Sequence, residues 1–209
     1  MDFNFTKDQD MIRETVRKFL ENECPKEKIR ELKEDDKGYD PDIWNKMLEL
    51  GWMGLVIPEE YDGIGAEYLD LMIIMEEMGR NVFMAPFFST VALCSLPIIK
   101  FGSDEQKKNI LPGIACGGDI WSFALLESSV DYEATGIELG ASPDGDGYKL
   151  NGTKLFVPYA NVSGNLLVAS RTGKKDNPED GITVFIVDAN SPGITTTVMP
   201  TAACDKRCE

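Results

Sequence analysis

Apolar residues near the start of the chain recur at the spacing of one helical face. Ile12, Val16 and Phe19 lie three or four positions apart, after a capping-box pattern at residues 6–9. Pro25 cannot continue a helix, because it has no backbone N–H to donate. These signals predict an amphipathic helix between the capping box and the proline.

Two shorter helices are predicted next. Residues 26–34 are mostly polar and suit a surface helix. The following helix starts at Pro41, a favoured first helical position, where the Asp40 side chain can cap it, and Gly51 ends it. The residues of that helix expected to face inward are Trp44, Met47 and Leu48.

The rest of the helical pattern is more apolar. Residues 57–65 are rich in turn-forming residues and predict a loop, whereas residues 69–78 are apolar on most helical faces, which predicts a buried helix. Residues 82–99 are interrupted by prolines and hydroxyl-bearing residues, so a buried core helix is expected there rather than a membrane span. A second capping box at residues 103–106 opens a helix that is expected to end before Pro112.

From Trp121 onward the pattern changes to short runs of β-branched and aromatic residues separated by turn signals. Asp144-Gly145 and Asn151-Gly152 are both typical of two-residue hairpin turns. The second turn is expected to join strands at residues 148–150 and 153–157. Further strands are expected at residues 166–170, 182–187 and 194–199.

Helices followed by strands, without alternation, predict an α+β chain rather than a doubly wound sheet. The expected domains are an all-helical domain at residues 1–118 and a barrel-like or sandwich-like β-domain at residues 119–209. With 209 residues, of which 43% are apolar and 27% charged, the chain can bury such cores. The common glycine-rich phosphate loops do not occur in the sequence, so a nucleotide cofactor would bind by another route.

The charge balance is strongly acidic. The chain has 21 Lys and Arg against 36 Asp and Glu, and its formal charge of −15 repels the phosphates of nucleic acids and anionic lipids. We therefore expect no nucleic-acid partner and no membrane span. The first twenty residues mix acidic, basic and apolar side chains, unlike a secretory or transit peptide, which indicates a cytoplasmic protein.

The sequence contains no histidine, which excludes the common Ser-His-Asp and Cys-His forms of catalysis. The cysteines are odd in number and form no C-x-x-C pair, which suits reduced thiols. Cys204 and Cys208 could pair or share a metal, but no second ligand cluster accompanies them, and no metal site is expected. The five cysteines are Cys24, Cys94, Cys116, Cys204 and Cys208.

Three stretches resemble the motifs of a known family in their order and separation. They are VIPEEYDGIG at residues 56–65, FGSDEQKK at residues 101–108, and the run from FALLE at residues 123–127 to DGYKLNGTK at residues 146–154. They are similar to the I-P-E-x-Y-G-G-x-G loop, the G-[ST]-x-x-Q-K-x helix start, and the A-L-T-E and D-G-x-Y-x-L-N-G-x-K motifs of acyl-CoA dehydrogenases. Together they span essentially the whole chain.

The resemblance implies a helical domain followed by a β-domain, FAD as cofactor, and an acyl-CoA substrate from fatty acid metabolism. Members of the family remove a proton and a hydride from the α and β carbons of the thioester. The electrons leave to an electron-transferring flavoprotein. The resemblance also implies assembly of the full-length protein as a homotetramer or as a hetero-oligomer.

The flavin contacts that the resemblance implies depart from the family pattern. Where the A-L-T-E motif has a threonine hydroxyl at the flavin edge, Leu126 can offer only its backbone N–H, and Tyr132 replaces a serine. The Trp-x-Thr segment becomes residues 156–158, which keep a ring for packing but lose the hydroxyl, a loss of about 1 kcal/mol for one hydrogen bond. The cofactor-binding residues implied are Phe123, Leu125, Leu126, Ser129, Tyr132, Phe156, Val157 and Pro158.

The resemblance also places one predicted helix along the acyl pocket of the family. Bulky rings there would shorten or flatten the pocket, but the same residues would also serve as ordinary core residues. The substrate-binding residues implied are Phe87, Phe88, Ser89, Leu93 and Tyr132.

In the family the catalytic base is a glutamate of a C-terminal helical domain. The resemblance therefore implies a truncated chain that lacks the base and is inactive alone, and no catalytic residue is assigned. Glu127 is expected to be a structural part of the flavin-side loop. Two alternatives remain: a non-catalytic structural subunit of a heteromeric acyl-CoA dehydrogenase, favoured by Leu126 and Pro158, and a flavin monooxygenase of the same fold.

Overall fold

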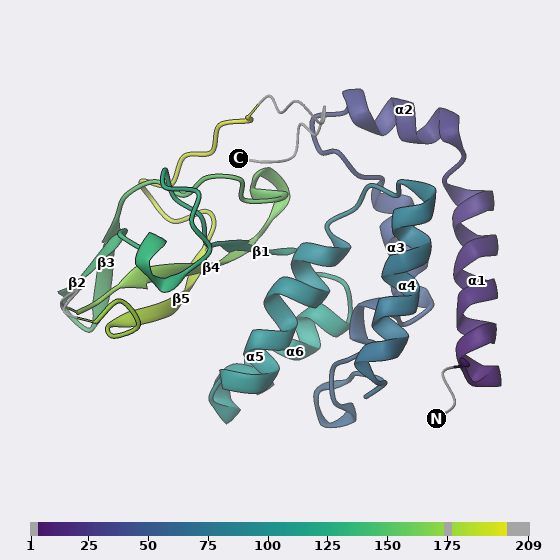
Figure 1. Ribbon diagram of the computed structural model, residues 1–209, viewed down its shortest axis with the longest axis horizontal. Helices are drawn as coiled ribbons and strands as arrows, with labels where there is room; N and C mark the ends of the chain where they lie inside the picture. The colour runs from purple at the N-terminus through teal and green to yellow at the C-terminus, as the bar shows by residue number, and fades with distance from the viewer. Residues whose placement is uncertain (1–3, 174–176, 200–209) are drawn as a thin grey trace. The chain divides into compact units, whose positions relative to one another are not determined.

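Helices form the first part of the chain and a sheet forms the second (Figure 1). The computed structural model describes residues 4–173 and 177–199, and the chain divides into two units, Met1–Gly118 and Asp119–Glu209. The predicted α+β class is confirmed. The helices of the first unit are α1 (Lys7–Glu23), α2 (Lys26–Glu34), α3 (Pro41–Glu49), the short 3₁₀ helices η1 (Trp52–Gly54) and η2 (Glu59–Tyr61), α4 (Tyr68–Asn81), the π-helix η3 (Phe88–Ser95), α5 (Leu96–Phe101) and α6 (Asp104–Ala115).

Several helices begin at the caps predicted from the sequence. The Thr6 hydroxyl accepts the Gln9 N–H at 3.2 Å, and the Gln9 side chain accepts the Thr6 N–H at 3.1 Å. Ser103 and Gln106 exchange the same two hydrogen bonds at the start of α6. The Asp40 carboxylate accepts two N–H groups from the first turn of α3. Both predicted capping boxes and the predicted aspartate cap are therefore confirmed.

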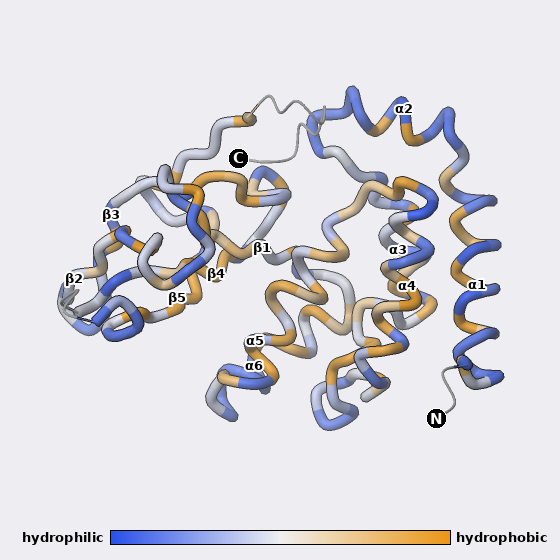
Figure 2. Tube along the Cα trace, viewed as in Figure 1, coloured by the Kyte–Doolittle hydropathy of each residue, from blue (hydrophilic) through white to orange (hydrophobic). Residues whose placement is uncertain are grey.

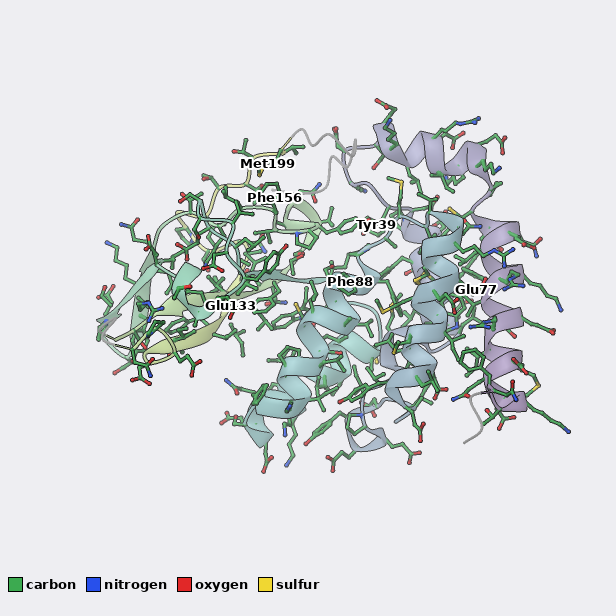
Figure 3. The ribbon with its side chains drawn as sticks, in the orientation of Figure 1. Tyr39, Glu77, Phe88, Glu133, Phe156 and Met199 are labelled. Atoms are coloured by element: carbon green, nitrogen blue, oxygen red, sulfur yellow. The ribbon has the colours of Figure 1, made fainter. Side chains whose placement is uncertain are left out.

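The helices α1 and α4 lie side by side (Figure 1). Val16 and Leu20 of α1 are buried, and the α1 tube in Figure 2 alternates between hydrophobic and hydrophilic residues, as expected of an amphipathic helix. Glu77 of α4 accepts two hydrogen bonds from Arg17 of α1, at 2.9 and 2.6 Å, and lies between the two helices (Figure 3). The hydrogen bonds from Arg17 lower the pKa of the Glu77 carboxyl, although burial opposes the shift.

The loop predicted at residues 57–65 contains the short 3₁₀ helix η2, and one glycine explains how tightly the chain turns there. A Cβ on Gly63 would lie 1.9 Å from the carbonyl oxygen of Ile57. The Gly65 N–H donates to the same carbonyl at 2.8 Å. Only glycine allows the chain to return this close to its own backbone.

The predicted burial of the apolar helices is wrong in part. In α4, Leu69 is 41% and Met72 is 63% exposed, because only one side of this helix faces α1 and the core. Residues 82–99 do not form one buried helix: Val82 ends α4 at a left-handed φ of +56°, and helical structure resumes with η3 and then α5. Pro97 lies in the first turn of α5, where its missing N–H removes no hydrogen bond of that helix.

The helix α6 continues through Pro112 to Ala115, so the predicted end before this proline is also wrong. A proline removes a single hydrogen bond, and the Cys116 N–H still reaches the Pro112 carbonyl oxygen at 2.9 Å. The helical unit ends beyond it, where Gly117 has a φ of +72° and its carbonyl oxygen accepts the indole N–H of Trp44 at 3.0 Å.

The sheet of the second unit is mixed and centres on β4. β1 pairs with β4 in parallel, β5 pairs with β4 antiparallel along its whole length, and β2 meets β4 in parallel where Gly140 lies opposite Arg171. β2 and β3 form an antiparallel hairpin. The elements are β1 (Trp121–Ala124), η4 (Ala134–Gly136), β2 (Gly140–Asp144), β3 (Gly147–Asn151), η5 (Ala160–Val162), β4 (Asn165–Arg171) and β5 (Ile182–Asp188).

A hairpin forms at one of the two predicted turns, although its turn residues are Gly145 and Asp146, one position later than the predicted Asp144-Gly145. Asp144 pairs with Gly147 across a two-residue turn in which Gly145 has a φ of +59°. The turn predicted at Asn151-Gly152 is wrong, because residues 153–157 form no strand and the Leu155 N–H donates instead to the Leu126 carbonyl oxygen. The predicted strand at residues 194–199 is wrong as well, since these residues form neither helix nor strand.

A small hydrophobic core in the second unit packs the segments that follow β1 and β3 against β4. Leu166 and Val168 of β4 contact Ala124, Val157 and Ala160 in one buried cluster. The ends of two segments distant in sequence are therefore fixed next to one another.

Candidate functional site

The two segments for which the sequence predicted flavin contacts lie together. One follows β1 and the other follows β3, and the Leu155 N–H donates to the Leu126 carbonyl oxygen at 2.9 Å. Ala124 and Val157 anchor the same two segments in the hydrophobic cluster. We call the residues 125–127 and 154–158 the paired loops.

A buried ion pair joins the paired loops. Lys154 Nζ lies 2.7 Å from Glu127 Oε1 and 2.9 Å from the carbonyl oxygen of Leu125. The two charged side chains are only 6% and 11% exposed. The Glu127 carboxylate also accepts the backbone N–H groups of Glu138 and Leu139 at 2.9 to 3.1 Å. Every hydrogen bond of this charge pair therefore connects separate stretches of backbone.

The electrostatics of the pair suit a structural carboxylate. Burial raises the pKa of the Glu127 carboxyl, but the hydrogen bonds from Lys154 and from the backbone outweigh it, so the pKa lies below its ordinary value. Burial lowers the pKa of the Lys154 ammonium group, and the pairing with Glu127 opposes this shift in part. A carboxylate with a lowered pKa and this many donors is a weak proton acceptor.

Phe156 lies in the second of the paired loops in an uncommon conformation. Its φ of +55° falls in the left-handed region, which bulky side chains rarely adopt. The Phe156 residue is 37% exposed, whereas its neighbour Val157 is 5% exposed and packs into the core. Phe156 is labelled in Figure 3. The backbone thus presents one aromatic ring at the surface of the unit.

Two buried hydroxyls hold the chain just beyond Phe156. The Ser122 hydroxyl of β1 donates to the carbonyl oxygen of Pro158. The Ser163 hydroxyl lies 2.9 Å from the Ser122 hydroxyl and 2.8 Å from the carbonyl oxygen of Tyr159. The sequence analysis did not single out Ser122, Ser163 or Lys154, although Lys154 closes the D-G-x-Y-x-L-N-G-x-K motif.

The remaining predicted flavin contacts differ in exposure. Leu126 and Val157 are both buried, at 6% and 5% exposure, so their side chains are not available to a ligand. Phe123 and Leu125 are half-buried. Ser129 and Tyr132 lie on an exposed loop, and Tyr132 is 72% exposed. The structure therefore brings Leu126 and residues 156–158 together, and it leaves Ser129 and Tyr132 on the surface.

The predicted substrate contacts of the first unit lie around η3. Phe87 is buried and Phe88 is half exposed, and both line an apolar hollow of about 180 Å³. Ser89 is buried, and its hydroxyl donates to the Pro86 carbonyl oxygen at 3.0 Å, while Leu93 is half-buried. This hollow is smaller than a typical ligand pocket of about 300 to 1,000 Å³. Its lining residues are Met75, Met78, Gly79, Phe83, Ala85, Phe87 and Phe88.

A larger apolar hollow of about 450 Å³ lies elsewhere in the first unit, and the sequence analysis did not find it. Met11 and Leu50 line this hollow, and both are apolar residues that the structure leaves exposed. Its lining residues are Asp8, Met11, Ile12, Thr15, Val16, Leu50, Trp52, Leu55 and Ile74.

The described residues offer neither a metal-binding cluster nor a membrane-spanning helix. Within residues 4–173 and 177–199, no group of three or more His, Cys, Asp or Glu side chains could hold a metal ion. The cysteine pair Cys204 and Cys208 lies outside the described residues. Of the helices in the described part of the chain, none is long and apolar enough to span a bilayer.

Two family models match the chain in succession. The acyl-CoA dehydrogenase N-terminal domain matches residues 6–118, and the acyl-CoA dehydrogenase middle domain matches residues 122–207. The chain belongs to the acyl-CoA dehydrogenase family. The family resemblance of the sequence motifs is thereby confirmed.

Curated relatives and solved structures agree with membership of the acyl-CoA dehydrogenase family. The probable acyl-CoA dehydrogenase YngJ of Bacillus subtilis is 32% identical over 94% of this chain and 52% of that protein. The caffeyl-CoA reductase-Etf complex subunit CarC of Acetobacterium woodii is 31% identical over 91% of this chain and 50% of that protein. A chain of the ChsE4-ChsE5 complex from Mycobacterium tuberculosis superposes with a TM-score of 0.86 at 25% identity, covering 100% of this chain and 54% of that chain. The chain spans about half the length of the curated relatives it matches.

Acyl-CoA dehydrogenases are flavoproteins, so the contacts that the paired loops offer can be compared with those that a bound flavin ring requires. Phe156 exposes an aromatic face that suits packing against a planar ring. The carbonyl oxygens of Leu126 and Pro158 already accept hydrogen bonds from Leu155 and Ser122, and proline has no N–H. The backbone N–H of Leu126 is the donor that remains at these two positions. The residues therefore fit the face of a flavin, with fewer donors for its polar edge than the family motif supplies.

Proposed function

We propose that the chain is part of a flavin-dependent acyl-CoA oxidoreductase that catalyses α,β-dehydrogenation of an acyl-CoA thioester. One observation carries this proposal: the two domain models match in order, and the paired loops of the second unit join the segments that correspond to the flavin motifs. Bound FAD would supply the acceptor for the hydride that leaves the β carbon, while a base takes the proton from the α carbon. The product is an enoyl thioester.

The roles proposed for individual residues follow the family motifs, and the partial exposure of Phe156 supports its role. Phe156 would pack on the flavin ring and the Leu126 N–H would donate to its edge, with Phe123, Leu125, Ser129, Tyr132, Val157 and Pro158 around them. Phe87 and Phe88 bound the acyl end of the substrate, next to Ser89 and Leu93, and Tyr132 also contacts the substrate. Glu127 is not the base, because its carboxylate is engaged by Lys154 and by two backbone N–H groups.

The partners proposed are an electron-transferring flavoprotein and further acyl-CoA dehydrogenase subunits. The name of the Acetobacterium woodii relative, a subunit of an Etf complex, supports the first partner. We also propose that the whole protein assembles as a homotetramer or a hetero-oligomer, and that it acts in the cytoplasm in fatty acid metabolism.

The test uses the whole protein as it is encoded, reconstituted with FAD and mixed without oxygen with short, branched, cyclic and long acyl-CoAs. At least one thioester is expected to bleach the absorption of the oxidised flavin, and an electron-transferring flavoprotein should restore it. If the protein holds stoichiometric flavin but no thioester bleaches its absorption, the proposed dehydrogenase activity is contradicted. Reoxidation by oxygen with incorporation of one oxygen atom into the substrate would indicate the flavin monooxygenase instead.

A second candidate is a non-catalytic structural subunit of a heteromeric acyl-CoA dehydrogenase. The absence of side-chain hydroxyls at Leu126 and Pro158 favours it, and the match to a chain of the ChsE4-ChsE5 complex shows that this architecture occurs in a complex. If the protein is such a subunit, the natural protein should bind no flavin, whereas the double variant Leu126→Thr/Pro158→Thr should retain flavin. Tight flavin binding by the natural protein, unchanged in the double variant, contradicts it.

A further inference from the structure

We infer that Lys154 and Ser122 are positioning residues that hold the Phe156 ring in place as a contact for a planar aromatic ligand. This inference rests on the proposed function, in which the ligand is the flavin of FAD. Neither residue touches the ligand in this scheme, and both act on it through Phe156.

Lys154 fixes the chain on the N-terminal side of Phe156. Its ammonium group bonds to Glu127 at 2.7 Å and to the Leu125 carbonyl oxygen at 2.9 Å, and the Leu155 N–H bonds to Leu126 at 2.9 Å. The charge pair is almost fully buried, so solvent screens it little. The two residues before Phe156 are thus tied to the opposite loop, Leu155 by its backbone N–H and Lys154 by its side chain.

Ser122 fixes the chain on the C-terminal side. Its hydroxyl belongs to β1, which β4 holds in parallel register, and it donates to the carbonyl oxygen of Pro158. Ser163 adds a second hydroxyl at 2.9 Å from the first. Ser122 is fully buried and Ser163 is 8% exposed, so these contacts do not compete with bulk water.

Phe156 lies between these two attachments at a φ of +55°. A phenylalanine rarely adopts this conformation, and it persists only where the surroundings determine it. The result is an aromatic residue that the fold keeps 37% exposed. Strain retained to expose an apolar ring is more useful for a ligand contact than for stability.

The same hydrogen bonds could instead serve only the stability of the unit, and a double-mutant cycle separates the two roles. The variants are Lys154→Met with Glu127→Gln, which removes both buried charges together, and Ser122→Ala. The matched controls are Lys149→Met and Ser142→Ala, which alter exposed residues of the β2–β3 hairpin. Each is made in the whole protein, with Phe156 and with Phe156→Ala, and FAD affinity is measured by flavin fluorescence.

If Lys154 and Ser122 act through Phe156, each variant should weaken FAD binding by about tenfold with Phe156 present, the loss expected of one hydrogen bond to a ligand contact. In the Phe156→Ala background the same variants should have no further effect, because the interaction they support is gone. The controls should leave affinity unchanged. Folded variants whose affinity stays within about twofold of the natural protein, or an equal loss in both backgrounds, would overturn the inference.

A fluorine label distinguishes failure of this inference from failure of the proposed function. With 4-fluorophenylalanine at position 156 and no flavin added, the natural protein should give one shifted ¹⁹F resonance, and Ser122→Ala should move it toward the free amino acid value. An unmoved resonance overturns the positioning role. A natural protein that binds no FAD overturns the proposed function, while the fluorine resonance still decides the positioning role.

Discussion

Replacing Arg171 with methionine should strongly destabilise the second unit. Arg171 ends β4 and is 8% exposed, and its guanidinium donates to four backbone carbonyl oxygens. These belong to Ile137 at 2.8 Å, Asp180 at 2.9 Å, Ala134 at 2.7 Å and Pro178 at 3.1 Å. One side chain therefore ties two separate loops to the central strand.

The magnitude follows from the hydrogen bonds. A hydrogen bond to a charged group contributes about 1.5 to 3 kcal/mol, but the carbonyl oxygens nearest the surface can regain water when the guanidinium is removed. We expect Arg171→Met to lower the free energy of unfolding by about 3 to 5 kcal/mol, because two or more buried carbonyl oxygens lose their donor at about 1 to 3 kcal/mol each. Arg171→Lys should recover less than half of this, because an ammonium group cannot span four acceptors in the plane of a guanidinium. The loss is a large share of an ordinary stability of about 5 to 15 kcal/mol.

The measurement is urea unfolding combined with amide hydrogen exchange in β4 and β5, because two units need not unfold together. Lys149→Met is the control, since it removes a positive charge from an exposed position of β3. The reasoning would be refuted if Arg171→Met lowered the stability of the second unit by less than about 1 kcal/mol, which is the cost of an ordinary surface change.

Two further predictions concern buried polar groups. Ser170 is fully buried, and its hydroxyl has no hydrogen-bond partner among the described residues. Ser170→Ala should therefore raise the free energy of unfolding by about 1 kcal/mol, whereas the control Ser142→Ala in β2 should leave it unchanged. If Ser170→Ala instead lowered the free energy of unfolding, the Ser170 hydroxyl would have a hydrogen-bond partner in the folded protein. The Glu77 carboxyl has a lowered pKa in the folded state, so its contribution is fully present above the unfolded value of about 4.3 and is lost as pH falls through the folded value. Urea unfolding should therefore show a gap of about 1 to 3 kcal/mol between the natural protein and Glu77→Gln near neutral pH, closing in acid; a gap that is constant with pH would contradict the assignment.

Features set by neighbouring residues were predicted well from the sequence. The capping boxes at Thr6 and Ser103 and the aspartate cap at Asp40 involve groups two or three positions apart, so their partners can be read directly. The same holds for the turn at Gly145, whose left-handed conformation favours glycine. These elements depend little on the rest of the fold.

Features set by distant partners were predicted poorly. Asn151-Gly152 has the composition of a hairpin turn, but the chain beyond it bonds to the loop after β1 instead of returning along β3. The apolar residues Leu69 and Met72 remain exposed, because apolar content does not tell which side of α4 faces a neighbour. In both cases the tertiary contacts override a local preference that the sequence states clearly.

The candidate site shows why a motif gives less than a structure. The family motif identified Leu126 and residues 156–158 as flavin contacts by resemblance, yet their sequence does not tell that Leu126 is buried or that Phe156 has a positive φ. The paired loops are joined to distant residues by Lys154, whose partner Glu127 lies 27 positions earlier, and by Ser122, whose partner Pro158 lies 36 positions later. Because side chains that far apart can meet only after β1, β3 and β4 are in place, the presentation of Phe156 is a property of the folded unit. A hydroxyl restored at position 126 or 158 would therefore reach a ligand only if these long-range contacts keep the paired loops in their present arrangement.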